Sequence, residues 1–137
     1  IISQMFLKGS DQQAMVMTLI TFGYKNGLPM DADLVFDVRF LPNPFYVPEL
    51  RHLTGDDPAV IDYLKKSPLT GDFLKHLNNM MEFLIPCYIQ EGKSYLTIAF
   101  GCTGGKHRSV FIANQLKEHF RSKGSDVRMI HRDIGKE

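Results

Sequence analysis

The side chains best suited to chemistry are concentrated in one short segment, residues 101–109. Lys106 and Arg108 carry full positive charges there, and Thr103 and Ser109 add hydroxyl groups. An arginine can hold a phosphate or carboxylate through two parallel hydrogen bonds. This composition is typical of an anion-binding loop. The alternative is a tight turn whose basic side chains are solvated.

The backbone of this segment also favours anion binding. Gly104 and Gly105 permit positive φ angles, with which successive N–H groups can point into one concavity. A helix expected from about 108 to 123 adds its unpaired first N–H groups and the positive end of its dipole. The string differs from the Gly-x-x-x-x-Gly-Lys-Ser/Thr pattern of nucleotide hydrolases. The predicted anion-binding residues of the loop are Thr103, Gly104, Gly105, Lys106, His107, Arg108 and Ser109.

Cys102 offers a catalytic alternative. Five residues separate it from Arg108, a spacing that resembles the signature of cysteine-dependent phosphatases. A thiol beside basic side chains and a helix start should have a lowered pKa and act as a nucleophile. However, Gly101 stands where those enzymes usually have histidine, and no general acid can be assigned. We therefore predict that Cys102 is structural and that this chain is not an enzyme, with catalysis by Cys102 and Arg108 as the alternative.

The elements that must position the loop follow from the spacing of apolar residues. Thr70 is expected to cap a long helix, and Pro86 to kink or end it. Three prolines in residues 41–55 predict a long loop, a feature that is often functional. Strands alternating with helices predict one α/β domain, with a small, mostly parallel sheet and helices on its faces. The predicted strands are 15–23, 34–39, 95–100 and about 127–130.

Composition sets broad limits on function. The 137 residues have a formal charge of +1, so any basic surface must be local. Two cysteines cannot form a disulfide framework, which favours a reducing cytoplasm. No apolar run reaches membrane-span length, and His52 and His76 lack partners at metal-ligand spacing, so we predict neither a membrane partner nor a metal. Because the chain opens with Ile1, we expect part of a longer protein, with 1–14 a linker or upstream segment and 15–137 the domain.

Two motifs, residues 36–44 and 101–110, carry a family resemblance. Together they resemble the C-terminal domain of the bacterial RapZ/YvcJ family, the RNase adapter proteins, which are also called nucleotide-binding proteins. The resemblance runs from about residue 17 to 133, nearly the whole chain.

The resemblance implies a fold and a set of partners. Full-length members carry an N-terminal ATP- or GTP-binding domain with a Walker-type loop. That domain is absent here, so we expect no cofactor in this fragment. The family's C-terminal domain is similar to a sugar-phosphate-binding subdomain of phosphofructokinase. Members that control amino-sugar synthesis sense glucosamine-6-phosphate and bind a small regulatory RNA, in partnership with a nuclease, and members form homo-oligomers.

The first motif extends the predicted ligand site. Asp37, Arg39 and Asn43 are expected to join it, with Asp37 taking a sugar hydroxyl or amine and Arg39 the phosphate. The alternative for Asp37 and Arg39 is a mutual ion pair that shapes the site. Phe45 follows Asn43 and Pro44 where sugar-sensing members have histidine, so the sequence departs from that pattern.

A weaker signal is the positive charge of the C-terminal part. Lys123, Arg128, Arg132 and Lys136 could contact RNA phosphates. The alternative is a solvated face in which these residues mix with acidic neighbours.

Overall fold

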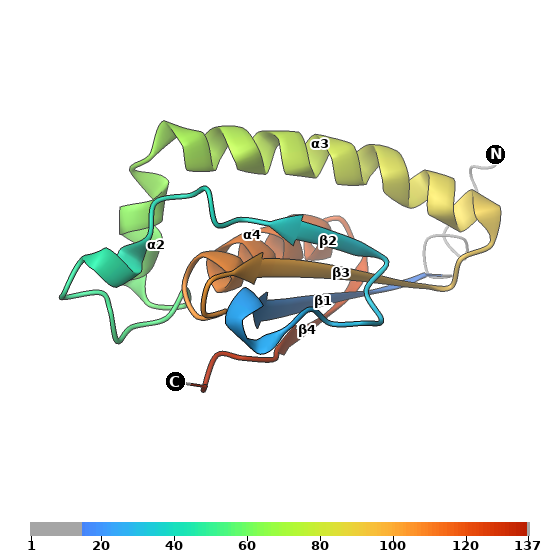
Figure 1. The fold of residues 1–137 in the computed structure, drawn as a ribbon. Helices are drawn as coiled ribbons and strands as arrows, with labels where there is room; N and C mark the ends of the chain where they lie inside the picture. Colours follow the sequence, from blue (N-terminus) through green and yellow to red (C-terminus); the bar gives the residue numbers. More distant parts are fainter. Residues whose placement is uncertain (1–14, 137) are drawn as a thin grey trace.

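The computed structural model describes residues 15–136 and contains one four-stranded sheet. The strand order is β2-β3-β1-β4, and every neighbouring pair is parallel (Figure 1). The predicted single α/β domain with a parallel sheet is thereby confirmed. The predicted segment 1–14 lies outside the described residues. The strands are β1 (Val16–Gly23), β2 (Leu34–Asp37), β3 (Tyr95–Cys102) and β4 (Asp126–His131).

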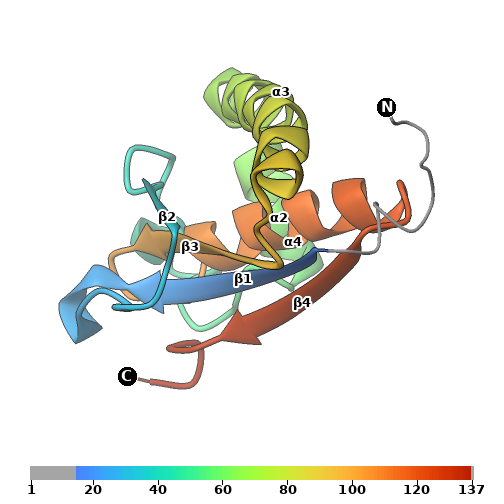
Figure 2. The same cartoon turned by 90° about the vertical axis from the view of Figure 1, so that its right-hand side faces the viewer.

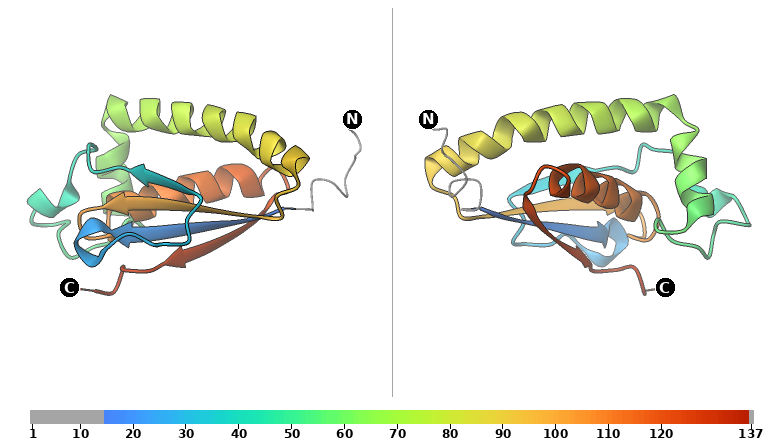
Figure 3. Two further views of the ribbon diagram at one scale, coloured as in Figure 1. Left: turned by 45° about the vertical axis from the view of Figure 1, so that its right-hand side comes forward. Right: turned by 180° about the vertical axis from the view of Figure 1, so that it is seen from behind.

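Three helices connect the strands: α2 (Pro58–Lys65), α3 (Pro68–Glu91) and α4 (Arg108–Arg121). The crossovers from β2 to β3 and from β3 to β4 progress across the sheet in the same direction. Right-handed connections therefore place α3 and α4 on the same face of the sheet. Figures 2 and 3 show this face covered by helices, whereas the opposite face carries none of the described helices.

The core lies between that face and α4. The helix buries an apolar stripe that includes Ile112, Leu116 and Phe120, and packs it against β1, β3 and β4. Ile98 and Phe100 of β3 are fully buried, as expected of a central parallel strand. None of the helices described is long and apolar enough to cross a membrane.

The long helix α3 departs from the prediction at its start, and of the two outcomes predicted for Pro86 it shows a bend rather than an end. Its N-cap is Ser67 rather than Thr70, because Pro68 suits the first helical position, where its missing N–H costs no hydrogen bond. Pro86 does not end the helix, which continues to Glu91 and stops at Gly92, in a left-handed conformation. Figure 1 shows the helix bending in its last turns, which is how a helix accommodates an internal proline.

All four strands point their carboxyl ends to one edge of the sheet. The segment after β1 forms a 3-10 turn, Tyr24–Asn26, and the long loop after β2 contains a second, Pro44–Tyr46. Loop 101–109, which comprises the connection from β3 to α4 together with the last two residues of β3 and the first two of α4, reaches the same edge, as does the segment after β4. Ligands of parallel α/β sheets bind at this edge, so the fold gathers the candidate site there.

Candidate functional site

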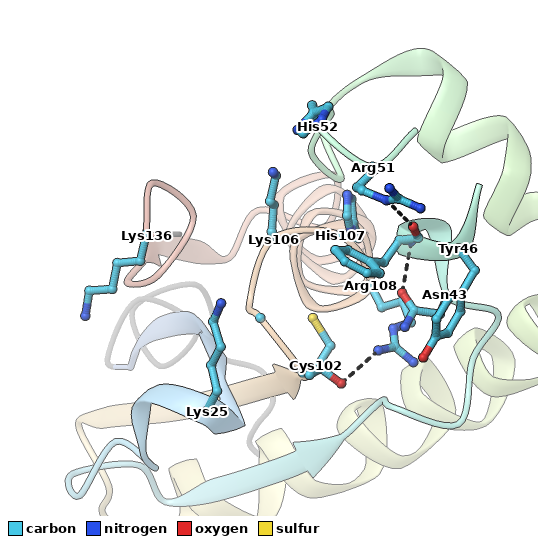
Figure 4. A pocket seen from close by; sticks show the side chains of 13 residues that line it. Lys25, Asn43, Tyr46, Arg51, His52, Cys102, Lys106, His107, Arg108 and Lys136 are labelled. Carbon is cyan, nitrogen blue, oxygen red and sulfur yellow. Dashed lines mark hydrogen bonds between the residues drawn. The ribbon is translucent and has the colours of Figure 1, made fainter. Parts of the chain in front are cut away.

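A pocket of about 400 Å³ opens at the carboxyl edge of the sheet (Figure 4). Segments that follow all four strands contribute to it, and loop 101–109 forms its floor. Its volume lies within the range of small-molecule sites. The lining residues are Lys25, Asn43, Phe45, Tyr46, Arg51, His52, Cys102, Thr103, Gly104, Lys106, His107, Arg108 and Lys136.

The lining is strongly cationic. Three lysines and two arginines belong to it, whereas no aspartate or glutamate does among the residues described. Within residues 15–136, Lys106, Arg51 and Arg108 form no ion pair with a carboxylate. Such a concentration of one charge sign in a concave site attracts anions.

The path of the loop is fixed by close backbone packing on the end of β1. A Cβ atom on Gly23 would lie 2.4 Å from the carbonyl carbon of Gly104. Gly105 has a φ of +77°, and a Cβ there would lie 2.5 Å from the Gly23 nitrogen. Glycine at these positions thus lets the loop lie directly against the strand.

Cys102 lies at the floor of the pocket and is buried. Its Sγ donates to the Ser109 hydroxyl at 3.2 Å and accepts the Ser109 N–H at 3.4 Å. Burial disfavours the thiolate, but the Ser109 hydroxyl, the Ser109 and Gly105 amides and the Arg108 charge outweigh it, so the pKa of Cys102 is lowered. The backbone amides of Gly105 and Ser109, which were expected to bind an anion, therefore already donate to the sulfur atom of Cys102.

Arg108, the first residue of α4, is only 4% exposed. Its guanidinium donates to the carbonyl oxygens of Arg39 and Leu41, and at 3.3 Å to the Thr103 hydroxyl. It thereby ties the segment after β2 to loop 101–109. Its Nε is buried without a hydrogen-bond partner among the described residues.

His107 precedes α4 and has a similar unpaired atom. The side chain is 6% exposed, and its Nε2 has no partner within the described chain. Burial, with the neighbouring Lys106 charge, lowers the pKa of His107, so the imidazole is neutral at pH 7. Hydrogen bonding to backbone groups of Leu50, Arg51 and Leu53 acts in the opposite direction on this pKa and holds the ring against the loop that precedes α2.

Asp37 and Arg39 do not line the pocket. Their side chains pair with each other at 2.7 Å, and the Arg39 guanidinium lies 3.9 Å from the centre of the Tyr24 ring. The mutual ion pair is therefore the arrangement observed. Of the other predicted residues, Asn43, Thr103, Gly104, Lys106, His107 and Arg108 line the pocket, whereas Gly105 and Ser109 support it from below.

The segment after β4 is anchored to the site by Asp133. This buried carboxylate accepts the Gly23 N–H at 2.8 Å and pairs with Arg132 and Lys136. Burial acts to raise its pKa, but these hydrogen bonds and charges outweigh burial and hold the pKa of Asp133 far below its usual range. Asp133 thereby fixes Lys136 at the pocket mouth.

Sequence reasoning missed five lining residues: Lys25, Phe45, Tyr46, Arg51 and His52. Lys25 directly follows β1, so the rule that ligands bind at strand carboxyl ends could have found it. The other four belong to the long loop predicted to be functional, but their spacing in the sequence does not indicate which of its residues line a pocket.

The residues predicted for RNA contact are dispersed. Lys123 pairs with Glu82 beside the end of α4, and Arg128 pairs with Asp126 on β4. Arg132 and Lys136 share Asp133 near the pocket. The described chain contains no group of three potential metal ligands.

Comparison with known proteins identifies the family of this chain. The chain is 57% identical over 136 residues to a nucleotide-binding protein of Thermoanaerobacter sp. (strain X514), covering 99% of this chain and 48% of that protein. It is 58% identical over 129 residues to a nucleotide-binding protein of Limosilactobacillus reuteri (strain DSM 20016), covering 94% and 43%. The chain therefore spans about half the length of these relatives. Residues 15–135 match the model of the RapZ C-terminal domain, and the chain belongs to this family.

Proposed function

We propose that this domain is a regulatory module that binds a small phosphate ester, such as a sugar phosphate, in the pocket above loop 101–109. The observation that carries this proposal is the lining: five cationic side chains and no carboxylate among the described residues. A dianionic phosphate would offset part of this charge, and the start of α4 adds the positive end of a helix dipole.

Two cations of the lining support the same ligand. Lys106 and Arg51 belong to it and form no ion pair with a carboxylate among the described residues. Phosphate oxygens are acceptors that can take N–H groups from an arginine and from backbone amides.

Thermal unfolding of the 137-residue chain tests the proposal. Glucose 6-phosphate should raise Tm and glucose should not, because a ligand at one hundred times its Kd stabilises the folded state by about 2.7 kcal/mol. Lys106→Gln should weaken the effect, and Lys93→Gln, which alters a lysine that is not part of the lining, is the matched control. An equal Tm with and without phosphate esters would contradict the proposal.

Arg108→Ala is a poor test because the guanidinium also holds the loop backbone. Alkylation of Cys102 by iodoacetamide gives an independent readout, since the thiol lies on the pocket floor. A bound phosphate ester should slow it, whereas alkylation of the exposed Cys87 should be unchanged.

Phosphatase chemistry is the second candidate, favoured by the position and lowered pKa of Cys102. Two observations weigh against it. The Arg108 guanidinium is held by backbone carbonyls, and no described carboxylic acid lines the pocket to protonate a leaving group. Hydrolysis of an aryl phosphate that is lost in Cys102→Ser would favour the phosphatase.

Contact with a small regulatory RNA, work with a nuclease and homo-oligomer formation are further proposals that rest on family membership. Binding of RNA through Lys123, Arg128, Arg132 and Lys136 would require these side chains to exchange a carboxylate partner for a phosphate.

A further inference from the structure

One flank of the long helix α3 carries a row of mostly apolar side chains outside the core. They recur at alternating steps of four and three residues, a spacing that keeps them in line along an α-helix. Figure 2 views α3 from its C-terminal end and shows α2 and α4 below it, with no described helix on the side of α3 that lies above β2. The members of the row are Leu69, Phe73, His76, Met80, Phe83 and Cys87.

Most of this row is exposed to solvent. Leu69 is 47% exposed, Met80 50% and Phe83 68%. Phe73 is partly buried because the ring of Phe40 packs edge-to-face on it, with ring centres 5.2 Å apart, and Phe40 is itself 50% exposed. We call the row, together with Phe40, the α3 flank. A continuous exposed apolar patch of this kind marks a protein interaction surface.

The alternating steps indicate what kind of partner fits the α3 flank. They are the spacing of the seam between two helices of a coiled coil, where apolar residues repeat about every 3.5 residues. The row is also self-complementary when a second copy runs in the opposite direction, because each residue then faces a member of the same row. The three pairs that face each other across the two copies are Leu69 with Cys87, Phe73 with Phe83, and His76 with Met80. Such reciprocal contacts are those of a two-fold interface.

Charges at the two ends of α3 favour the opposite direction of the two copies. Lys66 lies two residues before the helix, and Glu91 is its last residue. Both are exposed, and neither forms an ion pair within residues 15–136. Antiparallel copies would place Lys66 of each copy near Glu91 of the other, at both ends of the seam. Parallel copies would instead bring like charges together and align the two helix dipoles unfavourably.

From these observations we propose that the α3 flank is the interface of a homodimer, in which a second copy of this chain lies antiparallel along the same helix. The two-fold axis passes midway along the row, at the level of Asn78 and Asn79. No residue of the α3 flank lines the pocket, so both copies keep their pockets open. The inference goes beyond the proposed function, since it assigns one surface and one register to self-association.

Sedimentation equilibrium of the 137-residue chain under reducing conditions tests the interface. We expect a reversible monomer–dimer equilibrium. Phe83→Ser should raise the dissociation constant about tenfold or more, because each copy loses an aromatic anchor from the contact. Tyr95→Ser is the matched control and should leave the constant unchanged, since Tyr95 is 70% exposed on the sheet face that carries no described helix. A chain that stays monomeric up to millimolar concentration, or self-association that Phe83→Ser weakens no more than Tyr95→Ser does, would overturn the inference.

A disulfide test checks the register. Leu69→Cys should cross-link two copies under oxidising conditions through Cys87 of the partner subunit, because facing side chains lie within reach of a disulfide. Adding Cys87→Ser to the same chain should abolish the cross-link. Leu28→Cys is the matched control, since Leu28 is 52% exposed but lies outside the helix, and it should give no cross-linked dimer.

Two outcomes of the disulfide test would overturn the antiparallel register. One is the absence of a cross-link in Leu69→Cys. The other is a cross-link between the two copies of Cys87 in the wild-type chain, which would require parallel helices. In the antiparallel dimer these two thiols lie roughly 27 Å apart along the helix axis.

The dimer and the proposed function can fail separately. Phe83 is not part of the pocket lining, so Phe83→Ser should leave the stabilisation by glucose 6-phosphate unchanged. Because Phe83 is 68% exposed, the variant should also keep the circular dichroism spectrum of the wild type, which shows that lost self-association is not lost folding.

Discussion

The charged side chains at the amino ends of the strands are arranged differently from those at the carboxyl ends. At the amino edge, Lys93 pairs with Asp33 at 3.1 Å, and Glu82 accepts hydrogen bonds from His119 and Lys123. At the carboxyl edge, the five cations that line the pocket share the lining with no described carboxylate. These charges at the amino edge are balanced within the fold. At the carboxyl edge Asp37 and Asp133 balance Arg39, Arg132 and Lys136, whereas Lys106, Arg51 and Arg108 line the pocket and form no ion pair with a described carboxylate.

This difference separates the residues that contribute to stability from those that contribute to binding. Pairing at the amino edge adds a little to stability, as exposed ion pairs do. Clustered cations at the carboxyl edge repel one another and stabilise nothing by themselves. The glycines, Asp133 and the buried Arg108 hold this edge together, whereas the lysines do not. We therefore expect substitutions of the glycines and Asp133 to alter folding, and substitutions of the lysines to alter binding.

The largest expected effect is that of Gly105→Ala. Gly105 has positive φ, and its Cβ would meet backbone atoms of Phe22 and Gly23 within 2.6 Å. Left-handed strain and a backbone clash should together lower the free energy of unfolding by roughly 3 kcal/mol or more. Gly124→Ala is the control, with a similar φ of +87° but nothing within 4 Å, and should cost about 1 kcal/mol. Urea denaturation measures both, and equal losses would show that the loop is not packed as described.

An intermediate effect is expected for Asp133→Asn. Loss of the charged hydrogen bonds to Arg132 and Lys136 should cost about 2 kcal/mol at pH 7. Because the folded pKa of Asp133 lies below its unfolded value, its contribution is complete above about pH 4 and declines as the pH falls further. The stability difference between wild type and variant should therefore narrow in acid. Asp126→Asn, at an exposed pair, is the control and should change stability by less than about 0.5 kcal/mol.

The smallest effects on stability are expected for two lysines, one at each edge of the sheet. Lys93→Gln removes a paired cation and should lower the free energy of unfolding by about 0.5 kcal/mol. Lys106→Gln removes a cation from the pocket and should leave stability unchanged or slightly raised, within about 0.5 kcal/mol. The affinity for phosphate should fall in Lys106→Gln and remain unchanged in Lys93→Gln. Parallel denaturation and binding measurements on both variants check this, and a stability loss confined to Lys106→Gln would contradict it.

Most of the fold could be predicted because local patterns determine it. Buried apolar runs located all four strands, and the spacing of Val110, Ala113, Leu116 and Phe120 located α4. The boundaries of α3 were less predictable, since Thr70 and Ser67 are both acceptable caps and only Pro68 at the first position distinguishes them. The similarity to a phosphofructokinase subdomain stays a prediction.

The candidate site was predictable only in part. Loop 101–109 is continuous in sequence, so its residues could be recognised together. The direction in which a side chain points could not: Arg108 turns to the carbonyls of Arg39 and Leu41, and Arg39 turns to Asp37. Lys25 and Lys136 come together only through the β1–β4 side of the sheet, which no local pattern specifies.

The anchoring of residues 132–136 has a practical consequence for work with this domain. Asp133 is buried against β1 and Lys136 borders the pocket mouth, so an affinity tag fused after the last residue would emerge beside the ligand entrance. A polyhistidine or acidic epitope placed there could enter the cationic cavity and imitate or obstruct a ligand. Val16 starts β1 at the far edge, so a tag on that side, or its proteolytic removal, avoids this artefact.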